Sequence, residues 1–162
     1  MDLQQGSVAE GQGPDGCIVN CRRVLAYARD EGWQIVHVHR KSEPPLARPI
    51  AGLEPLLTEP VLYRTALSPF SNRSFRDLVD AAGAAHMVVI GYSVTQSFLA
   101  TALIAYDEDL SVVLVEDAIG SGALDHETRD AIGVLGQRVA SPFLVLTTTD
   151  ALVGGPRLRR VV

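Results

Sequence analysis

Cysteine and long apolar runs are both scarce in this chain, and each scarcity excludes a class of protein. The 162 residues include 2 cysteines, too few for a disulfide framework. Cys17 and Cys21 are one helical turn apart, so we interpret them as small buried core residues. No apolar run approaches the length of a bilayer span, and the first residues lack the pattern of a signal peptide. We therefore expect a soluble protein of the cytoplasm that does not enter membranes.

Positive charge is also sparse, and this makes a nucleic-acid partner unexpected. The chain has 14 Lys and Arg against 19 Asp and Glu, with a net charge of −5. Its one cationic cluster, Arg157, Arg159 and Arg160, follows Gly154-Gly-Pro156. The length and the apolar fraction of 47% fit one globular domain over residues 1–162. We expect residues 154–162 to form a tail.

Apolar patterns along the chain predict strands that alternate with helices. A polar, glycine-rich loop is expected over residues 6–16 and a long irregular connection over residues 40–60. The expected strands cover residues 33–39, 61–63, 87–90, 110–116 and 143–146, and the expected helices cover residues 16–31, 74–82, 127–139 and a segment that begins at Thr95. This order predicts an α/β fold: three layers, with a mainly parallel open sheet and helices on both faces.

Ligands of such folds bind at the carboxyl ends of the strands, which here lie near Arg64, Gly91–Ser97 and Glu116–Asp117. Gly91 follows a buried strand, and Thr95 is a candidate N-cap for the next helix. Ser97 is then in the first helical turn, where free N–H groups favour negative charge. The alternative, that Ser97 is an ordinary polar residue of that turn, is favoured by the local sequence alone.

Several short motifs occur in the order and spacing of one known family. The segments are Asp2-Leu-Gln4, Ala28-Arg-Asp-Glu-Gly-Trp-Gln-Ile-Val-His37, Arg64-Thr-Ala-Leu-Ser-Pro-Phe70, Gly91-Tyr-Ser-Val-Thr-Gln-Ser97 and Glu116-Asp-Ala118. Together they resemble the isochorismatase-like, or cysteine hydrolase, family over nearly the whole chain. The resemblance includes that family's Asp-x-Gln, Lys-x-x-x-Ser-Ala-Phe and Gly-x-x-Thr-x-x-Cys motifs, with arginine in the lysine position and serine in the cysteine position.

The resemblance implies a Rossmann-type hydrolase with a small-molecule substrate, either an amide or a vinyl ether. It implies no cofactor, and it implies a homo-oligomer, a dimer or a tetramer, to which the connection over residues 40–60 could contribute. The residue-by-residue correspondence gives Asp2, Arg64 and Ser97 as the catalytic set. The substrate-binding residues implied by the same motifs are Gln4, Phe70, Tyr92, Ser93 and Thr95.

Two of the three catalytic positions depart from the family pattern. A serine hydroxyl is a weaker nucleophile than a cysteine thiolate and needs a positioned base. Arg64 can pair with a carboxylate but cannot transfer protons as lysine does, and it would favour the ionised form of Asp2. The branch of isochorismatases proper, which cleaves a vinyl ether, fits Ser97. An inactive descendant that serves as a small-molecule binding or assembly module is the alternative function.

Two further features bear on the site. His37 and His39 share a strand face but have no evident third ligand, so we expect no metal and interpret them as histidines with local partners. In the family, an apolar strand precedes the Asp-x-Gln motif, whereas here Asp2 is the second residue. The first strand therefore looks missing or truncated, and if it is absent, Asp2 is expected to lie on a frayed terminus. The alternatives are that the protein starts further upstream or that another segment or subunit fills the place of the strand.

Overall fold

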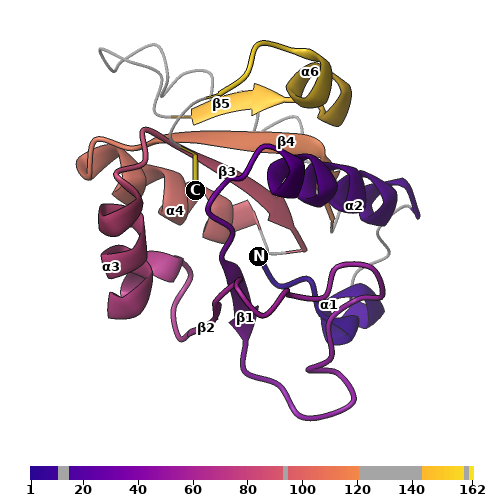
Figure 1. Ribbon diagram of the computed structural model, residues 1–162. Helices are drawn as coiled ribbons and strands as arrows, with labels where there is room; N and C mark the ends of the chain where they lie inside the picture. Colours follow the sequence, from indigo (N-terminus) through magenta and orange to yellow (C-terminus); the bar gives the residue numbers. More distant parts are fainter. Residues whose placement is uncertain (11–14, 93–94, 121–143, 159–160) are drawn as a thin grey trace.

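The computed structural model describes residues 1–10, 15–92, 95–120, 144–158 and 161–162 (Figure 1). In chain order the elements are α1 (Gln5–Glu10), α2 (Asp15–Asp30), β1 (His37–Arg40), β2 (Val61–Arg64), the 3-10 helix η1 (Pro69–Ser71), α3 (Arg73–Ala82), β3 (His86–Gly91), α4 (Thr95–Asp107), β4 (Ser111–Ile119), β5 (Leu144–Thr147) and α6 (Thr149–Gly154). Helices separate β2 from β3 and β3 from β4, as predicted, whereas residues 41–60 join β1 to β2 without a helix. The helix predicted over residues 127–139 lies outside the described residues.

All described strand pairs are parallel, so the predicted α/β class is confirmed. The strands form two sheets, a two-stranded sheet β1-β2 and a three-stranded sheet β3-β4-β5. His37 pairs with Val61 in the first sheet, and Val88 pairs with Val113 in the second. The predicted single open sheet is therefore divided between β1 and β3. Figure 1 shows both ends of the chain in the space between these two strands.

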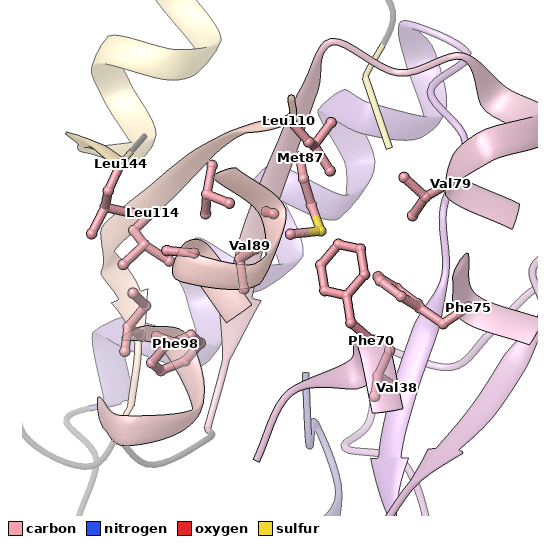
Figure 2. Close-up of a cluster of buried hydrophobic side chains, with 14 residues drawn as sticks. Val38, Phe70, Phe75, Val79, Met87, Val89, Phe98, Leu110, Leu114 and Leu144 are labelled. Carbon is pink, nitrogen blue, oxygen red and sulfur yellow. The ribbon is translucent and has the colours of Figure 1, made fainter. Parts of the chain in front are cut away.

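Helices cover both faces of the three-stranded sheet. Along β3, Met87 and Val89 belong to a core with side chains of α3 and α4, whereas Val88 and Ile90 pack against a second core that includes α2 and α6. This alternation follows from the pleat of a strand, which directs successive side chains to opposite faces. Figure 2 shows the first core, in which Met87 of β3 lies beside Phe70.

Helix α3 illustrates why local sequence predicted its end. The Asn72 side chain accepts a hydrogen bond from the Ser74 backbone N–H at 3.0 Å, which caps the first turn. Gly83 ends the helix in the left-handed conformation, with φ of 54°.

Among the described residues, no helix is long and apolar enough to cross a membrane.

The loop predicted over residues 6–16 is wrong at both of its ends, because α1 occupies Gln5–Glu10 and α2 begins at Asp15, while residues 11–14 lie outside the described residues. The prediction took Gly6 as a sign of a loop, but this glycine permits close packing. A Cβ at Gly6 would lie 3.1 Å from the Cβ of Leu46. The Gly6 N–H also donates to the Leu46 carbonyl at 3.0 Å. The short helix is therefore fixed by a contact with a distant loop, which no local pattern contains.

The start of the chain is held in place, so the frayed terminus expected for an absent first strand does not occur at Asp2. The Met1 amine donates to the Ile90 carbonyl at 2.5 Å, and the Met1 carbonyl accepts from the Tyr92 N–H at 3.0 Å. The Asp2 N–H donates to the Val38 carbonyl at 2.7 Å. These bonds join the first two residues to β1 on one side and to the end of β3 on the other. Asp2 is buried, with 1% of its surface exposed.

Gly91 is the residue that allows Met1 to lie so close to β3. Its φ is +131°, and a Cβ at this position would overlap the Met1 carbonyl oxygen. We expect Gly91→Ala to lower the free energy of unfolding by about 1 to 3 kcal/mol, because the backbone becomes strained and Met1 must move. Chemical denaturation measures this loss. The control is Gly16→Ala, at an exposed position in α2 with open space around it, which we expect to be neutral or stabilising. Equal effects of the two substitutions would contradict the prediction.

Candidate functional site

A buried ion pair joins two of the three residues predicted to be catalytic. The Arg64 Nη2 donates to Asp2 Oδ2 at 2.6 Å, and the Arg64 Nε lies 3.1 Å from Oδ2 and 3.3 Å from Oδ1. The exposed fractions of the side chains are 7% for Arg64 and 1% for Asp2. A charged pair with so little water around it needs this close, forked geometry to offset the cost of burial.

The position of Arg64 follows from β2, which ends at this residue. The remaining end of its guanidinium, Nη1, donates to the Ala66 carbonyl at 2.7 Å. Arg64 is thus bonded both to the carboxylate and to the loop that follows its own strand. These contacts use the guanidinium to hold the Asp2 carboxylate in place.

Ser97, the third predicted catalytic residue, is in the first turn of α4 and is fully buried at 0% exposure. Its Oγ has no hydrogen-bond partner among the described residues. Its carbonyl accepts a hydrogen bond from the Thr101 hydroxyl at 2.6 Å. Most buried hydroxyls are bonded, because an unpaired one loses its bonds to water without replacement. Ser97 is therefore a buried donor without a protein acceptor in the described part of the chain.

The residues predicted to bind substrate have different environments. Gln4 holds the backbone of the last residue of β1: its Oε1 accepts from the Arg40 N–H at 3.0 Å and its Nε2 donates to the Arg40 carbonyl at 3.1 Å. Phe70 and Tyr92 are core residues with 2% and 4% exposure. Thr95 begins α4, its side chain lies outside the description, and Ser93 is outside the described residues. The substrate-binding assignments remain predictions.

The acidic end of β4 contributes to packing. Asp117 Oδ1 accepts from both the backbone N–H and the hydroxyl of Thr149, each at 2.8 Å. Thr149 is the first residue of α6, so the carboxylate ties this helix to the sheet and favours its positive end. The strand end that sequence reasoning offered as a ligand site therefore has a structural role.

A second buried polar cluster lies at β1 and was not predicted as a unit. Glu59 accepts a hydrogen bond from Arg29 Nε at 2.8 Å and lies 2.8 Å from His37 Nε2. The hydrogen bond from Arg29 lowers the pKa of Glu59 to about 2. Burial lowers the pKa of His37, and burial also lowers the pKa of His39 to about 4. The sequence signal was the pair of histidines on one strand face, but Glu59 lies too far along the chain to be recognised as the partner of His37.

The geometry of this cluster agrees with the interpretation of His37 as a histidine with a local partner. Its ring lies 6.3 Å from that of His39, with the planes at 79°. Within the described ranges, no group of three His, Cys, Asp or Glu side chains is placed to hold a metal ion.

Comparisons with known proteins agree with this architecture. The family model described as the isochorismatase domain matches residues 1–150. No curated protein matches the chain in sequence. An isochorismatase family protein from Desulfovibrio vulgaris is 25% identical, with a TM-score of 0.77 over 93% of this chain and 92% of that one.

Other solved structures share the fold at lower identity. An isochorismatase from Pseudomonas putida is 24% identical, with a TM-score of 0.77 over 93% of this chain and 86% of that one. The MAR1 ribonuclease from Caenorhabditis elegans is 18% identical, with a TM-score of 0.72 over 94% of this chain and 76% of that one. At these identities the likeness concerns the fold and not the reaction. The match of the family model over residues 1–150, on a fold that these structures share, shows that the chain belongs to the isochorismatase family.

Proposed function

We propose that the chain is a hydrolase that acts on a small polar metabolite, with Asp2 as the residue that moves protons. The observation that carries this proposal is the buried, forked ion pair between Asp2 and Arg64, at 2.6 Å. It lies where β2 ends, and Met1 joins it to the residue that follows β3. A carboxylate held in a fixed geometry inside the protein is what general acid or base catalysis needs.

The arginine beside Asp2 favours one of the two predicted reactions. Cleavage of a vinyl ether starts with a proton donated to the substrate, whereas hydrolysis of an amide starts with a proton taken from the attacking group. Arg64 stabilises the carboxylate, which accepts a proton, over the neutral acid, which donates one. We therefore favour an amide or a related carbonyl compound as the substrate, with water as the attacking group.

Ser97 and the start of α4 then have a supporting role. The first turn of a helix carries N–H groups without helical partners, and these stabilise an oxygen atom that gains negative charge during the reaction. The buried Ser97 hydroxyl, which lacks a described acceptor, adds a further donor near this turn. In this arrangement the hydroxyl stabilises charge and does not itself attack the carbonyl carbon.

Screening of small amides and vinyl ethers tests the proposal. For a substrate found in this way, we expect Asp2→Asn to lower kcat/KM by at least about 100-fold, because the amide group cannot accept a proton. We expect Ser97→Ala to lower kcat by roughly 10- to 1,000-fold, the range for removal of one donor to a developing oxyanion. Thermal unfolding of each variant separates lost chemistry from lost structure. Full activity in a folded Asp2→Asn variant would contradict the mechanism.

A non-catalytic binding or assembly module is the second candidate. The complete burial of Ser97 and the contacts that occupy the Arg64 guanidinium support this alternative. The connection between β1 and β2 also exposes large apolar side chains: Leu46, Leu56 and Leu57 are 47%, 51% and 109% exposed. Such side chains favour a contact between copies of the chain. No turnover of any screened compound, together with a dimer or tetramer by analytical ultracentrifugation, would support the module.

A further inference from the structure

The two cysteines of the chain form a buried pair that the proposed hydrolase mechanism does not use. Cys17 and Cys21 lie one turn apart in α2, and both are buried against the sheet. The Cys21 thiol donates to the Ala118 carbonyl at 3.1 Å, and the Cys17 sulfur is a second acceptor within its reach. The sequence contains no other cysteine, so these thiols can react only with each other or with another molecule.

The surroundings of the pair make Cys17 the more reactive thiol. Cys17 is in the first turn of α2, where backbone N–H groups lack helical partners and stabilise a thiolate. The hydrogen bond from Cys21 lowers the pKa of Cys17, and this effect exceeds the opposing effect of burial. The same hydrogen bond, together with burial, raises the pKa of Cys21. The pair thus combines one thiol that ionises readily with one that keeps its proton.

A disulfide between these two thiols does not fit a closed helix. Residues four apart in an α-helix have Cβ atoms about 5 to 6 Å apart, whereas the Cβ atoms of a disulfide lie about 3.5 to 4.5 Å apart. Bond formation therefore requires a change in the backbone of α2. The turn that contains Cys17 can change most easily, because it is at the end of the helix and includes Gly16, which is exposed and weakens a helix.

We infer that Cys17 and Cys21 are a pair that a peroxide oxidises to a disulfide, and that this disulfide holds the first turn of α2 open. When the turn opens, the Cys17 thiolate attacks one peroxide oxygen and the O–O bond breaks. Cys17 becomes a sulfenic acid, and the other oxygen leaves as hydroxide or alkoxide and takes a proton from water. The Cys21 sulfur then attacks the Cys17 sulfur, the S–O bond breaks, and the oxygen leaves as water with the Cys21 proton. The two sulfurs lose two electrons, which the peroxide gains.

Oxidation also removes part of the attachment of α2 to the sheet. Two adjacent side chain bonds join the closed helix to β4: the Cys21 thiol donates to the Ala118 carbonyl, and the Asn20 Nδ2 donates to the Asp117 carbonyl at 3.0 Å. A disulfide has no thiol proton, so the Cys21 bond is lost. We therefore expect the oxidised protein to keep its fold but to have a looser start of α2.

Mass spectrometry tests the chemistry in the full chain. After treatment of the folded protein with hydrogen peroxide, trypsin releases residues 1–22, which contain both cysteines. We expect this fragment to lose two hydrogen atoms and to regain them with dithiothreitol. We expect dimedone to trap a sulfenic acid at Cys17 in the Cys21→Ser variant, and Cys17→Ser to react with peroxide at least about tenfold more slowly than Cys21→Ser. Absence of the disulfide in the unmodified chain, a disulfide between two copies, or equal rates for the two variants would overturn the inference.

Hydrogen exchange tests the opening of the helix. We expect the amides of residues 19–21 to exchange about tenfold or more faster in the oxidised protein than in the reduced one, because their helical bonds to the first turn are lost. Dithiothreitol should restore the slow exchange. The control is the double variant Cys17→Ser with Cys21→Ser under the same treatment, which reports any effect of methionine oxidation. Oxidation to the disulfide with unchanged exchange of these amides, or equal changes in the control, would show that the disulfide does not hold the turn open.

Discussion

Arg64→Ala is expected to lower the free energy of unfolding by about 3 to 5 kcal/mol, the typical cost of removing one partner from a buried ion pair. The substitution leaves the Asp2 carboxylate at 1% exposure, without the guanidinium that lies 2.6 Å away. Urea denaturation measures the loss. The double variant Asp2→Asn with Arg64→Ala should recover part of it, because the uncompensated charge is gone.

The matched control is Arg23→Ala. Arg23 lies 2.6 Å from Asp150, the same distance as in the buried pair, but the two side chains are 47% and 83% exposed. Exposed pairs contribute about 0 to 1 kcal/mol, so this substitution should have little effect. If both arginine variants lose the same small amount, Arg64 does not stabilise a buried charge, and the positioning role proposed for it is wrong.

Acidification below pH 6.5 is expected to destabilise the protein through His39. Burial lowers the pKa of His39 from 6.5 to about 4 in the folded chain. Between these values the unfolded chain binds a proton that the folded chain does not, so stability falls as the pH falls through this window. At 1.36 kcal/mol per pKa unit, this difference between the His39 pKa values of the unfolded and folded chain corresponds to a loss of roughly 3 kcal/mol in the free energy of unfolding.

His39→Gln should flatten this part of the pH profile. The measurement is the free energy of unfolding in urea at intervals from pH 7 to pH 4, for the unmodified chain and the variant. Any slope that remains in this window belongs to other groups, among them His37, whose pKa burial also lowers. Glu59 acts in a lower window, because its pKa is about 2 and its contribution is lost only as the pH falls from about 4.5 toward 2. Identical slopes for the two proteins would contradict the assignment to His39.

The elements that sequence predicted well depend on local patterns. The apolar run of β3 and the helix that ends at Gly83 can be recognised from a few adjacent residues. The short helices α1 and α6 were missed because each is held by distant groups, Leu46 for α1 and Asp117 for α6. The division into two sheets depends on which strand edges meet, and pairing between distant segments is not encoded in any local period.

The candidate site shows the same limit. The motif resemblance assigned Asp2 and Arg64 to one site although they are 62 positions apart in the sequence. In the structure they form one ion pair. The resemblance could not show that the Arg64 guanidinium also donates a hydrogen bond to the Ala66 carbonyl, because that bond depends on the path of the chain from β2 to η1. Nor could it show the buried cluster at Glu59, which depends on the packing of α2 against residues 54–59.

The reactivity of the two thiols on the buried face of α2 reports how often this helix separates from the sheet. Cys17 and Cys21 are 2% and 0% exposed, and the Cys21 thiol donates to the Ala118 carbonyl in β4. A thiol reagent can therefore reach them only when α2 separates from the sheet. The rate of their alkylation under native conditions measures how often this helix opens, and comparison with the global unfolding rate shows whether α2 leaves the fold alone or together with the rest of the domain.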